Sequence, residues 1–351
     1  MESLNKRKYY LDIIRIIATY AIIILHVASK YIGGGQYRPV LIFWDGCVRW
    51  AVPAFVMISG ALFLSPHKQM STKRLWKKNI PRMFFSLIFW TSIYVLFEYW
   101  VFDLDLHSCK MYLITGYWHM WFVWMITGLY IITPFIRQIV KVPQLIKYYL
   151  VMFVFVTILV PTLRYMIIPY TNISRSEWVA KIFTNIDTMN FKFFLGFTGY
   201  FILGYYFDTI TLSRTRRRII FLLGILSFPF GIYANEYLTL FCGATTPFDD
   251  SFSITSFLQT IFIFNIFKYH SGWVSKKISC KIITSFSACS FGIYMVHILL
   301  RQLLDRYFAL NAESFGMPVI IVPLLSLLIF LIGYVISFIF HQIPILKKYV
   351  V

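Results

Sequence analysis

The sequence predicts an all-α protein with about ten transmembrane helices, and three observations lead to this fold class. Of the 351 residues, 59% are hydrophobic and only 13% are charged, whereas about 25% of the residues of a soluble globular chain are charged. Ten mostly apolar stretches qualify as spans, for which about 20 residues are needed. The basic residues fall in every second connection between these stretches. Length alone would allow a soluble two-domain enzyme, but this composition excludes one.

The predicted spans follow one another through the whole chain, which we treat as a single domain of residues 1–351. Helix is the expected form of each span, because the membrane core offers no partner to unpaired backbone groups. The stretch that begins at Ile254 is the shortest and the most polar. The ten spans are Tyr9–Ser29, Val40–Leu64, Ile80–Val101, Trp118–Arg137, Leu145–Ile168, Phe191–Ile210, Ile219–Tyr237, Ile254–Phe267, Ile283–Leu304 and Pro318–Ile343.

The formal net charge of +19 is explained by the loops between these spans. Of the 33 Lys and Arg residues, 22 precede the first span, follow the last, or lie in every second loop. Ten alternating spans place all of these on one side of the membrane, and most acidic residues on the other. Because cytoplasmic loops collect Lys and Arg, both termini are predicted to be cytoplasmic. The expected partner of the basic charge is therefore the lipid bilayer, and no nucleic acid is expected.

The first span contains three ionisable residues, Asp12, Arg15 and His26. From Arg15 to His26 there are eleven residues, which at ~100° per residue is nearly three full turns, so both side chains share one face. Along the axis they are about 16 Å apart. Asp12 is three residues before Arg15 and can pair with it. A lipid-snorkelling Arg with its Asp, and a hydrogen-bonded His, is one interpretation. The other is a general base, His26, with Arg15 holding an anionic group of an elongated donor.

The ninth span carries a second polar stripe. Ser290, Tyr294, His297 and Arg301 follow at intervals of four, three and four residues, so they lie on one helix face. His297 is expected at a depth near that of His26, as a hydrogen-bonded core residue or as part of a site. His119 opens the fourth span among aromatic residues, where an interfacial belt is the simpler explanation.

The basic loop before the third span has two interpretations. Its cations serve as orientation signals, or they bind the phosphates of a donor, as Lys and Arg do well. The candidates for phosphate binding are Arg74, Lys77, Lys78 and Arg82. The five cysteines are scattered without metal-ligand spacing, so no metal site and no bound cofactor are expected.

Six segments, taken in order, resemble the acyltransferase-3 family of integral membrane acyltransferases. Together they cover nearly the whole chain, and their order is more specific than any one of them. The segments are Leu11-Asp12-Ile13-Ile14-Arg15 with His26, Val52-Pro53-Ala54-Phe55-Val56-Met57-Ile58-Ser59-Gly60, Lys73-Arg74-Leu75-Trp76-Lys77-Lys78 with Pro81-Arg82, Trp118-His119-Met120-Trp121-Phe122 with Gly128-Leu129-Tyr130 and Pro134, Tyr200-Phe201-Ile202-Leu203-Gly204-Tyr205-Tyr206, and Ser290-Phe291-Gly292-Ile293-Tyr294-Met295-Val296-His297.

The resemblance implies a ten-helix fold and the transfer of an acyl group, usually acetyl, from cytoplasmic acetyl-CoA as substrate. The implied acceptor is a hydroxyl of an envelope or exported glycan or of its lipid-linked precursor, in a bacterial inner (plasma) membrane. His26 corresponds to the catalytic histidine of the family and Arg15 to its donor-side partner. Many relatives have a Glu at the position of Ile126, so this chain resembles the branch of stand-alone O-acetyltransferases more closely.

These observations lead to one functional expectation and two alternatives. His26 is expected to act as general base on the acceptor hydroxyl, while Arg15, oriented by Asp12, holds the donor. His297 and Tyr294 are expected to position the acceptor or to stabilise the oxyanion, with Ser290, His119 and Arg301 nearby. A transporter or flippase for a lipid-linked sugar would also use intramembrane charges, and a non-catalytic scaffold would need neither Arg15 nor His26. The sequence names neither the acceptor glycan nor the oligomeric state.

Overall fold

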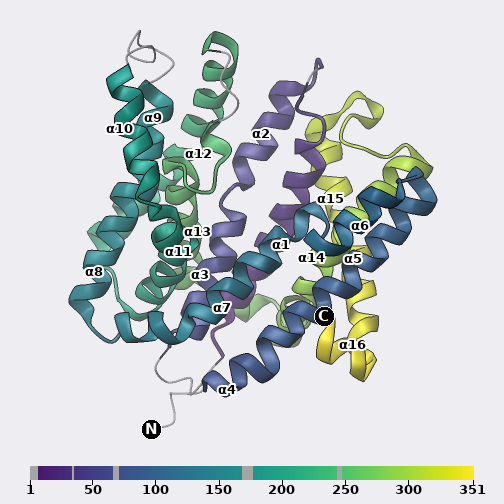
Figure 1. Cartoon of the computed structure of the whole chain (residues 1–351), viewed down its shortest axis with the longest axis horizontal. Helices are drawn as coiled ribbons and strands as arrows, with labels where there is room; N and C mark the ends of the chain where they lie inside the picture. The colour runs from purple at the N-terminus through teal and green to yellow at the C-terminus, as the bar shows by residue number, and fades with distance from the viewer. Residues whose placement is uncertain (1–6, 34, 66–70, 168–176, 243–246) are drawn as a thin grey trace.

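The computed structural model is a bundle of α-helices and describes residues 7–33, 35–65, 71–167, 177–242 and 247–351 (Figure 1). These residues form helices, turns and connections, without a β-strand, so the predicted all-α class is confirmed. The helices are α1 (Tyr9–Ser29), α2 (Arg38–Val48), α3 (Ala51–Phe63), α4 (Thr72–Arg74), η1 (Leu75–Asn79), α5 (Ile80–Phe102), α6 (Leu106–Thr115), η2 (Trp118–Met120), α7 (Trp121–Ile139), α8 (Pro143–Met152), η3 (Phe153–Leu159), α9 (Val160–Ile167), α10 (Glu177–Thr188), α11 (Phe191–Thr209), α12 (Arg214–Cys242), η6 (Pro247–Asp249), α13 (Ile254–Lys277), α14 (Cys280–Phe308), η7 (Ser314–Gly316), α15 (Pro318–Gln342) and α16 (Pro344–Tyr349).

In the described part of the chain, eight helical segments are long and apolar enough to cross a membrane. They are α1, α2–α3, α4–α5, α6–α7, α8–α9, α12, α14 and α15. The two other predicted spans, α11 and α13, are also helical, and the C-terminal end of α11 contacts α13. Asp208, near the end of α11, forms an ion pair with Lys8 at 2.7 Å, and Lys268 of α13 donates to the Ile210 carbonyl at 2.6 Å. The chain is thus a polytopic membrane protein built on the ten predicted helical segments.

Two local features differ from the predicted spans. The second span is broken between α2 and α3 at Arg49–Trp50. Pro53 explains the break, because it has no N–H to donate to the carbonyl four residues earlier. A segment expected as a loop forms α6, which begins where the Asp105 carboxylate accepts hydrogen bonds from the amides of His107 (2.9 Å) and Ser108 (3.0 Å). An Asp at this position satisfies amides that have no partner inside the helix.

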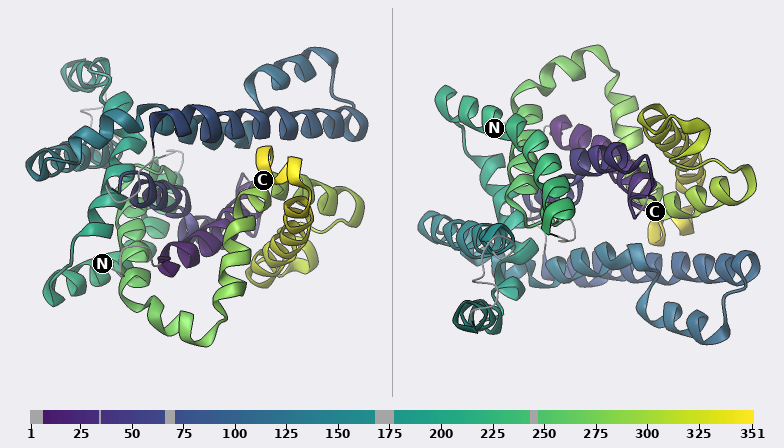
Figure 2. Two further views of the ribbon diagram at one scale, coloured as in Figure 1. Left: turned by 90° about the horizontal axis from the view of Figure 1, so that it is seen from below. Right: turned by 90° about the horizontal axis from the view of Figure 1, so that it is seen from above.

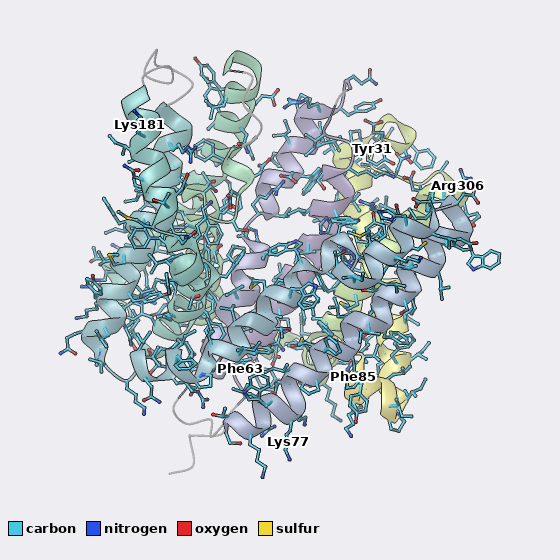
Figure 3. All side chains as sticks on the ribbon, in the orientation of Figure 1. Tyr31, Phe63, Lys77, Phe85, Lys181 and Arg306 are labelled. Atoms are coloured by element: carbon cyan, nitrogen blue, oxygen red, sulfur yellow. The ribbon has the colours of Figure 1, made fainter. Side chains whose placement is uncertain are left out.

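The basic residues mark one end of the bundle. Lys77 lies at the same end as α4 and α16, and Tyr31 and Arg306 lie toward the other end (Figure 3). We call these the basic end and the far end. The described chain enters α1 and leaves α15 at the basic end, which agrees with termini on one side. Figure 2 shows α5 as a long rod along one side of the bundle, with α6 folded back beside it.

Helices α1 and α14 run parallel. The Arg15 guanidinium donates to the Ser287 hydroxyl at 3.2 Å, and nearer the far end the Arg301 guanidinium donates to the His26 carbonyl at 2.8 Å. These pairs are 272 and 275 residues apart in sequence. Because this difference in residue number is nearly constant, residue numbers increase in the same direction along both helices. The two polar stripes predicted from the sequence therefore face each other along their length.

Helices α3 and α11 touch through their backbones. A Cβ atom on Gly60 would lie 1.7 Å from the Phe201 carbonyl oxygen, and one on Gly204 would lie 2.0 Å from the Met57 carbonyl oxygen. Small residues allow such close approach of helices in membranes. This contact fixes α3, which forms one wall of the central cavity described below.

Candidate functional site

Three histidine rings from three elements meet inside the bundle. The ring centroids of His26 and His297 are 5.2 Å apart, and those of His119 and His297 are 5.5 Å apart. His119 and His297 are each only 1% exposed, whereas His26 is partly exposed. Trp118 packs edge-on against His26, with ring centroids 5.2 Å apart. We call His26, His119 and His297 the histidine cluster.

Hydrogen bonds to the backbone hold this cluster. Nδ1 of His297 lies 2.5 Å from the carbonyl oxygen of Tyr294, and the Tyr294 hydroxyl donates to the carbonyl oxygen of His119 at 2.5 Å. A carbonyl only accepts, so Nδ1 of His297 carries the proton and Nε2 keeps its lone pair. Nε2 of His297 is buried without a partner in hydrogen-bond geometry, whereas the ring of His119 faces the carbonyl of Met295. Because buried polar atoms are usually paired, the unpaired Nε2 of His297 can accept a hydrogen bond from a hydroxyl group.

A central cavity of about 500 Å³ lies between the basic end and the histidine cluster. Its lining changes along its length. Arg15, Arg82, Lys347 and His341 line it toward the basic end, with Tyr130, Ser59 and Ser287 following. Its inner part is lined by Phe55, Phe122, Ile126, Ser290 and Tyr294. The cavity is therefore cationic at one end and mostly apolar at the other.

Tyr294 separates this cavity from the histidine cluster. Its ring lines the cavity, and its centroid is 5.9 Å from that of His119 and 5.5 Å from that of His297. Phe122, which also lines the cavity, packs edge-on against Tyr294 at 5.4 Å. None of the three histidines lines the cavity. The cavity thus ends directly beside the cluster, behind two aromatic rings.

Asp12 is linked to Arg15 mainly through the hydroxyl of Ser287, which forms a hydrogen bond with each. The Asp12 carboxylate forms its closest ion pair with Arg7, at 2.6 Å, and lies 3.9 Å from the Arg15 guanidinium. The Ser287 hydroxyl donates to Asp12 at 2.6 Å and accepts from Arg15 at 3.2 Å. The hydrogen bond to Asp12 raises the pKa of Arg7. Asp12 thus orients Arg15 mainly through Ser287, a residue that the sequence stripe did not include.

The predicted residues separate into those that meet at the site and those that do not. His26, His119, Tyr294, His297 and Arg301 come together as described above. Ser290 lies in the cavity instead, where its hydroxyl donates to the carbonyl of Phe286 at 3.1 Å. Of the four candidates for phosphate binding, Arg82 lines the cavity. The other three, Arg74, Lys77 and Lys78, are exposed and do not line it.

The structure adds residues that the sequence stripes omit. Lys347 on α16 and His341 near the end of α15 both line the cavity, a placement that only the tertiary fold determines. Arg49 binds Asp45 at 2.6 Å and Asp249 at 3.6 Å. Arg49 and Arg301 both act electrostatically on the His26 ring. Asp45 and Arg49, four residues apart inside a predicted span, carried a signal in the sequence, because intramembrane charges mark functional sites.

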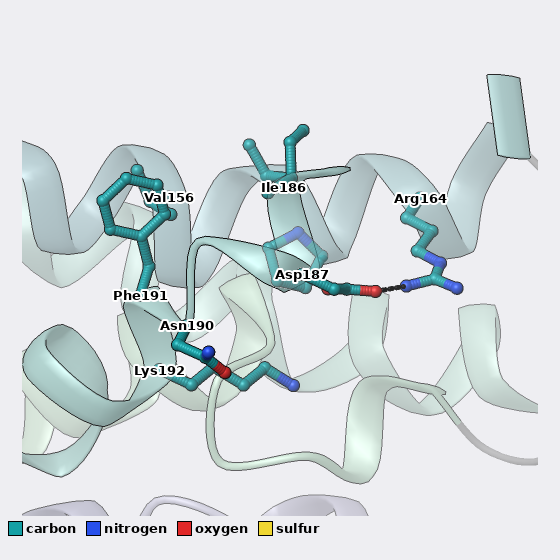
Figure 4. Close-up of a pocket in the computed structure, with 9 residues that line it drawn as sticks. Val156, Arg164, Ile186, Asp187, Asn190, Phe191 and Lys192 are labelled. Carbon is teal, nitrogen blue, oxygen red and sulfur yellow. Dashed lines mark hydrogen bonds and ion pairs between the residues drawn. The ribbon is translucent and has the colours of Figure 1, made fainter. Parts of the chain in front are cut away.

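A second cavity, of about 320 Å³, lies between α9, α10 and the start of α11 (Figure 4). Arg164 and Asp187 form an ion pair there at 3.0 Å, and Asn190 and Lys192 complete its polar lining. Both partners of the pair are exposed, at 43% and 61% of the side chain. This cavity shares no lining residue with the central cavity and carries none of the predicted site residues.

Residues 8–341 match the family described as an acyltransferase domain, Acyl_transf_3. The chain is a member of the acyltransferase-3 family. This match covers nearly the whole chain and confirms the resemblance that the six segments carried. No curated protein and no solved structure matched the chain in the comparisons. Within this acyltransferase, Ile126 is 3% exposed and lines the inner part of the cavity with an apolar side chain.

Proposed function

We propose that this membrane acyltransferase moves an acetyl group from cytoplasmic acetyl-CoA to a hydroxyl of an envelope or exported glycan, or of its lipid-linked precursor. The observation that carries the proposal is the polarity of the central cavity, cationic at the basic end and apolar beside the histidine cluster. A coenzyme A thioester has the same polarity, with phosphates at one end and the acyl group at the other. The proposed site of action is a bacterial inner membrane, with the basic end in the cytoplasm.

The donor would enter from the basic end. Arg15, Arg82 and Lys347 supply the cations that bind phosphate oxygens through charge-assisted hydrogen bonds. A cavity of about 500 Å³ is in the range of small-molecule sites. It accommodates the thin arm of the donor and leaves the nucleotide at the basic end. The thioester then lies against Tyr294, at the inner wall.

The chemistry requires a base for the acceptor hydroxyl and a site for the developing oxyanion. His26 takes the proton of the hydroxyl, whose oxygen attacks the thioester carbonyl. The new C–O bond forms, the C–S bond breaks, and the proton passes from His26 to the departing sulfur. Nε2 of His297 binds the acceptor, and the Tyr294 hydroxyl stabilises the oxyanion once the ring turns from the His119 carbonyl.

The test uses labelled acetyl-CoA with membranes from cells that express the protein. His26→Ala is expected to lower transfer to the extracted glycans by about 10²-fold or more, the usual contribution of a general base. His270→Ala is the matched control, because His270 is exposed on α13 and its Nδ1 lies 3.0 Å from the carbonyl oxygen of Ile266 on the same helix. Transfer by His26→Ala at the parental rate would show that this mechanism is wrong. Mass spectrometry of envelope glycans with and without the protein would identify the acceptor by one acetyl group.

A further inference from the structure

The side chain of Tyr94 is joined to the backbone of α14 at two points. Tyr94 lies on α5 and is 0% exposed. Its hydroxyl donates to the carbonyl oxygen of Met295 at 2.9 Å and accepts from the amide of Leu299 at 3.0 Å. In a regular α-helix the amide of Leu299 would donate to that same carbonyl. The hydroxyl therefore bridges the donor and the acceptor of one helical hydrogen bond.

The bridged turn is the one that carries His297. His297 is the middle residue between Met295 and Leu299, so the position of its ring follows the position of this turn. A side chain that inserts into the helical hydrogen-bond ladder is a recognised cause of local bending. Tyr94 thus sets the backbone from which His297 projects, although it contacts neither the central cavity nor His26.

Tyr94 also forms the wall behind His119. Its ring packs edge-on against His119 at 5.0 Å and stacks on Tyr117 at 4.5 Å, with an interplanar angle of 15°. The Met295 carbonyl that binds Tyr94 faces the His119 ring as well. Tyr94 therefore contacts the ring of His119 and the backbone turn that carries His297.

A polar network holds this aromatic pair in place. The Tyr117 hydroxyl donates to the Glu98 carboxylate at 2.5 Å, and the Gln302 amide donates to the same oxygen at 2.6 Å. Glu98 lies on α5, one turn beyond Tyr94, and Gln302 follows Arg301 on α14. The network connects α5, the residue before η2 and α14, so the ring of Tyr94 has little freedom to move.

We propose that Tyr94 is a positioning residue for His297 and His119 in the acyl-transfer reaction, an inference that rests on the proposed function. Without the hydroxyl, the Leu299 amide can bond directly to the Met295 carbonyl, and the turn that carries His297 closes up. A misplacement of about 1 Å in an active site can lower the rate by ~10²-fold. The KM for the donor would not change, because Arg15, Arg82 and Lys347, the cations of the central cavity, lie outside the turn from Met295 to Leu299.

The test compares Tyr94→Phe with Tyr20→Phe. Tyr20 is the matched control, since its hydroxyl also crosses to another helix and donates to a backbone carbonyl, that of Pro323, at 2.9 Å. Membranes from expressing cells supply both enzyme and acceptor, and labelled acetyl-CoA is varied. Tyr94→Phe is expected to lower kcat about 10-fold or more, with the KM for acetyl-CoA unchanged. Amide hydrogen exchange at Leu299 is expected to change in Tyr94→Phe and to stay at the parental rate in Tyr20→Phe.

Each outcome either supports or overturns the proposed role of Tyr94. A kcat of Tyr94→Phe equal to that of Tyr20→Phe overturns it, whatever happens to hydrogen exchange. A raised KM with an unchanged kcat also overturns it, because Tyr94 would then shape the donor cavity. If Tyr94→Phe yields little folded protein, para-aminophenylalanine at position 94 restores a polar group, and parental kcat with restored exchange at Leu299 is expected. If that variant folds but remains slow, the inference is wrong. His26→Ala, assayed in parallel, reports separately on the proposed function.

Discussion

Gly60 lies where α3 and α11 touch, and adding one methyl group there should destabilise the protein. The new Cβ would lie 1.7 Å from the Phe201 carbonyl oxygen, and real Cβ atoms essentially never come closer than 3.0 Å to such an atom. The helices must therefore separate by more than an ångström. Overpacking of this kind costs about 1–3 kcal/mol, and the better helix propensity of Ala returns up to about 1 kcal/mol. Gly60→Ala is expected to lose roughly 1–2 kcal/mol, which lowers Tm by ~2–4 °C.

Gly128 provides the matched control. It lies inside α7, and a Cβ there would meet nothing within 4 Å. Gly128→Ala is therefore expected to gain up to about 1 kcal/mol from helix propensity alone. Tryptophan fluorescence during heating in detergent micelles measures both variants. If Gly60→Ala melts at the temperature of Gly128→Ala or above it, the helices are not in backbone contact and the steric reasoning fails. In Gly60→Ala, the KM for acetyl-CoA should also rise, because α3 carries two residues of the cavity wall.

Three further predictions follow from the placement of charged groups. Arg82→Gln should raise the KM for acetyl-CoA, the proposed donor, about 10-fold, because one charge-assisted hydrogen bond to the donor is lost. Arg74 is exposed outside the cavity, so Arg74→Gln should leave this KM unchanged in the same radiolabel assay. Arg49→Met should destabilise the protein by about 3–5 kcal/mol, because two carboxylates lose their cation. Lys30→Met removes an ion pair with Asp305 whose side chains are 41% and 20% exposed and should cost at most about 1 kcal/mol; equal Tm losses would refute this contrast. Hydrogen bonds from Ser108 and His107 lower the pKa of Asp105, so the start of α6 is held at neutral pH and is released as pH falls through that lowered pKa. Asp105→Ala should speed amide exchange in α6 at pH 7, and unchanged exchange would contradict the assignment of the cap.

The helices of this acyltransferase could be located from the sequence because apolar length is a local property. The span predicted at Pro318–Ile343 is observed as Pro318–Gln342, and α1 has the predicted bounds. The break before Pro53 could also have been predicted, because proline has no backbone N–H and this effect depends only on the local sequence. The extra helix at Leu106–Thr115 was missed because it contains Lys110 and His107 and is too polar and too short to resemble a span.

The site was only partly predictable, because periodicity identifies a face of a helix but not its neighbour. The spacing of Arg15 and His26 placed them on one face of α1, and the spacing of Tyr294 and His297 placed them on one face of α14. No local rule states that these faces meet at 5.2 Å. Lys347 could not be assigned to the cavity, since its approach depends on the fold of the last turns.

The parallel course of α1 and α14 constrains how the chain is inserted into the membrane. Two helices that point the same way must be separated by an odd number of crossings. Five of the eight apolar segments lie between them, and α11 with α13 makes seven. Either number keeps His26 and His297 at the same depth, but insertion of only one of these two weakly apolar helices would invert α14. Biogenesis of an active enzyme therefore requires α11 and α13 to be inserted together or not at all, so a mutation far from the histidines could abolish activity by changing the number of crossings alone.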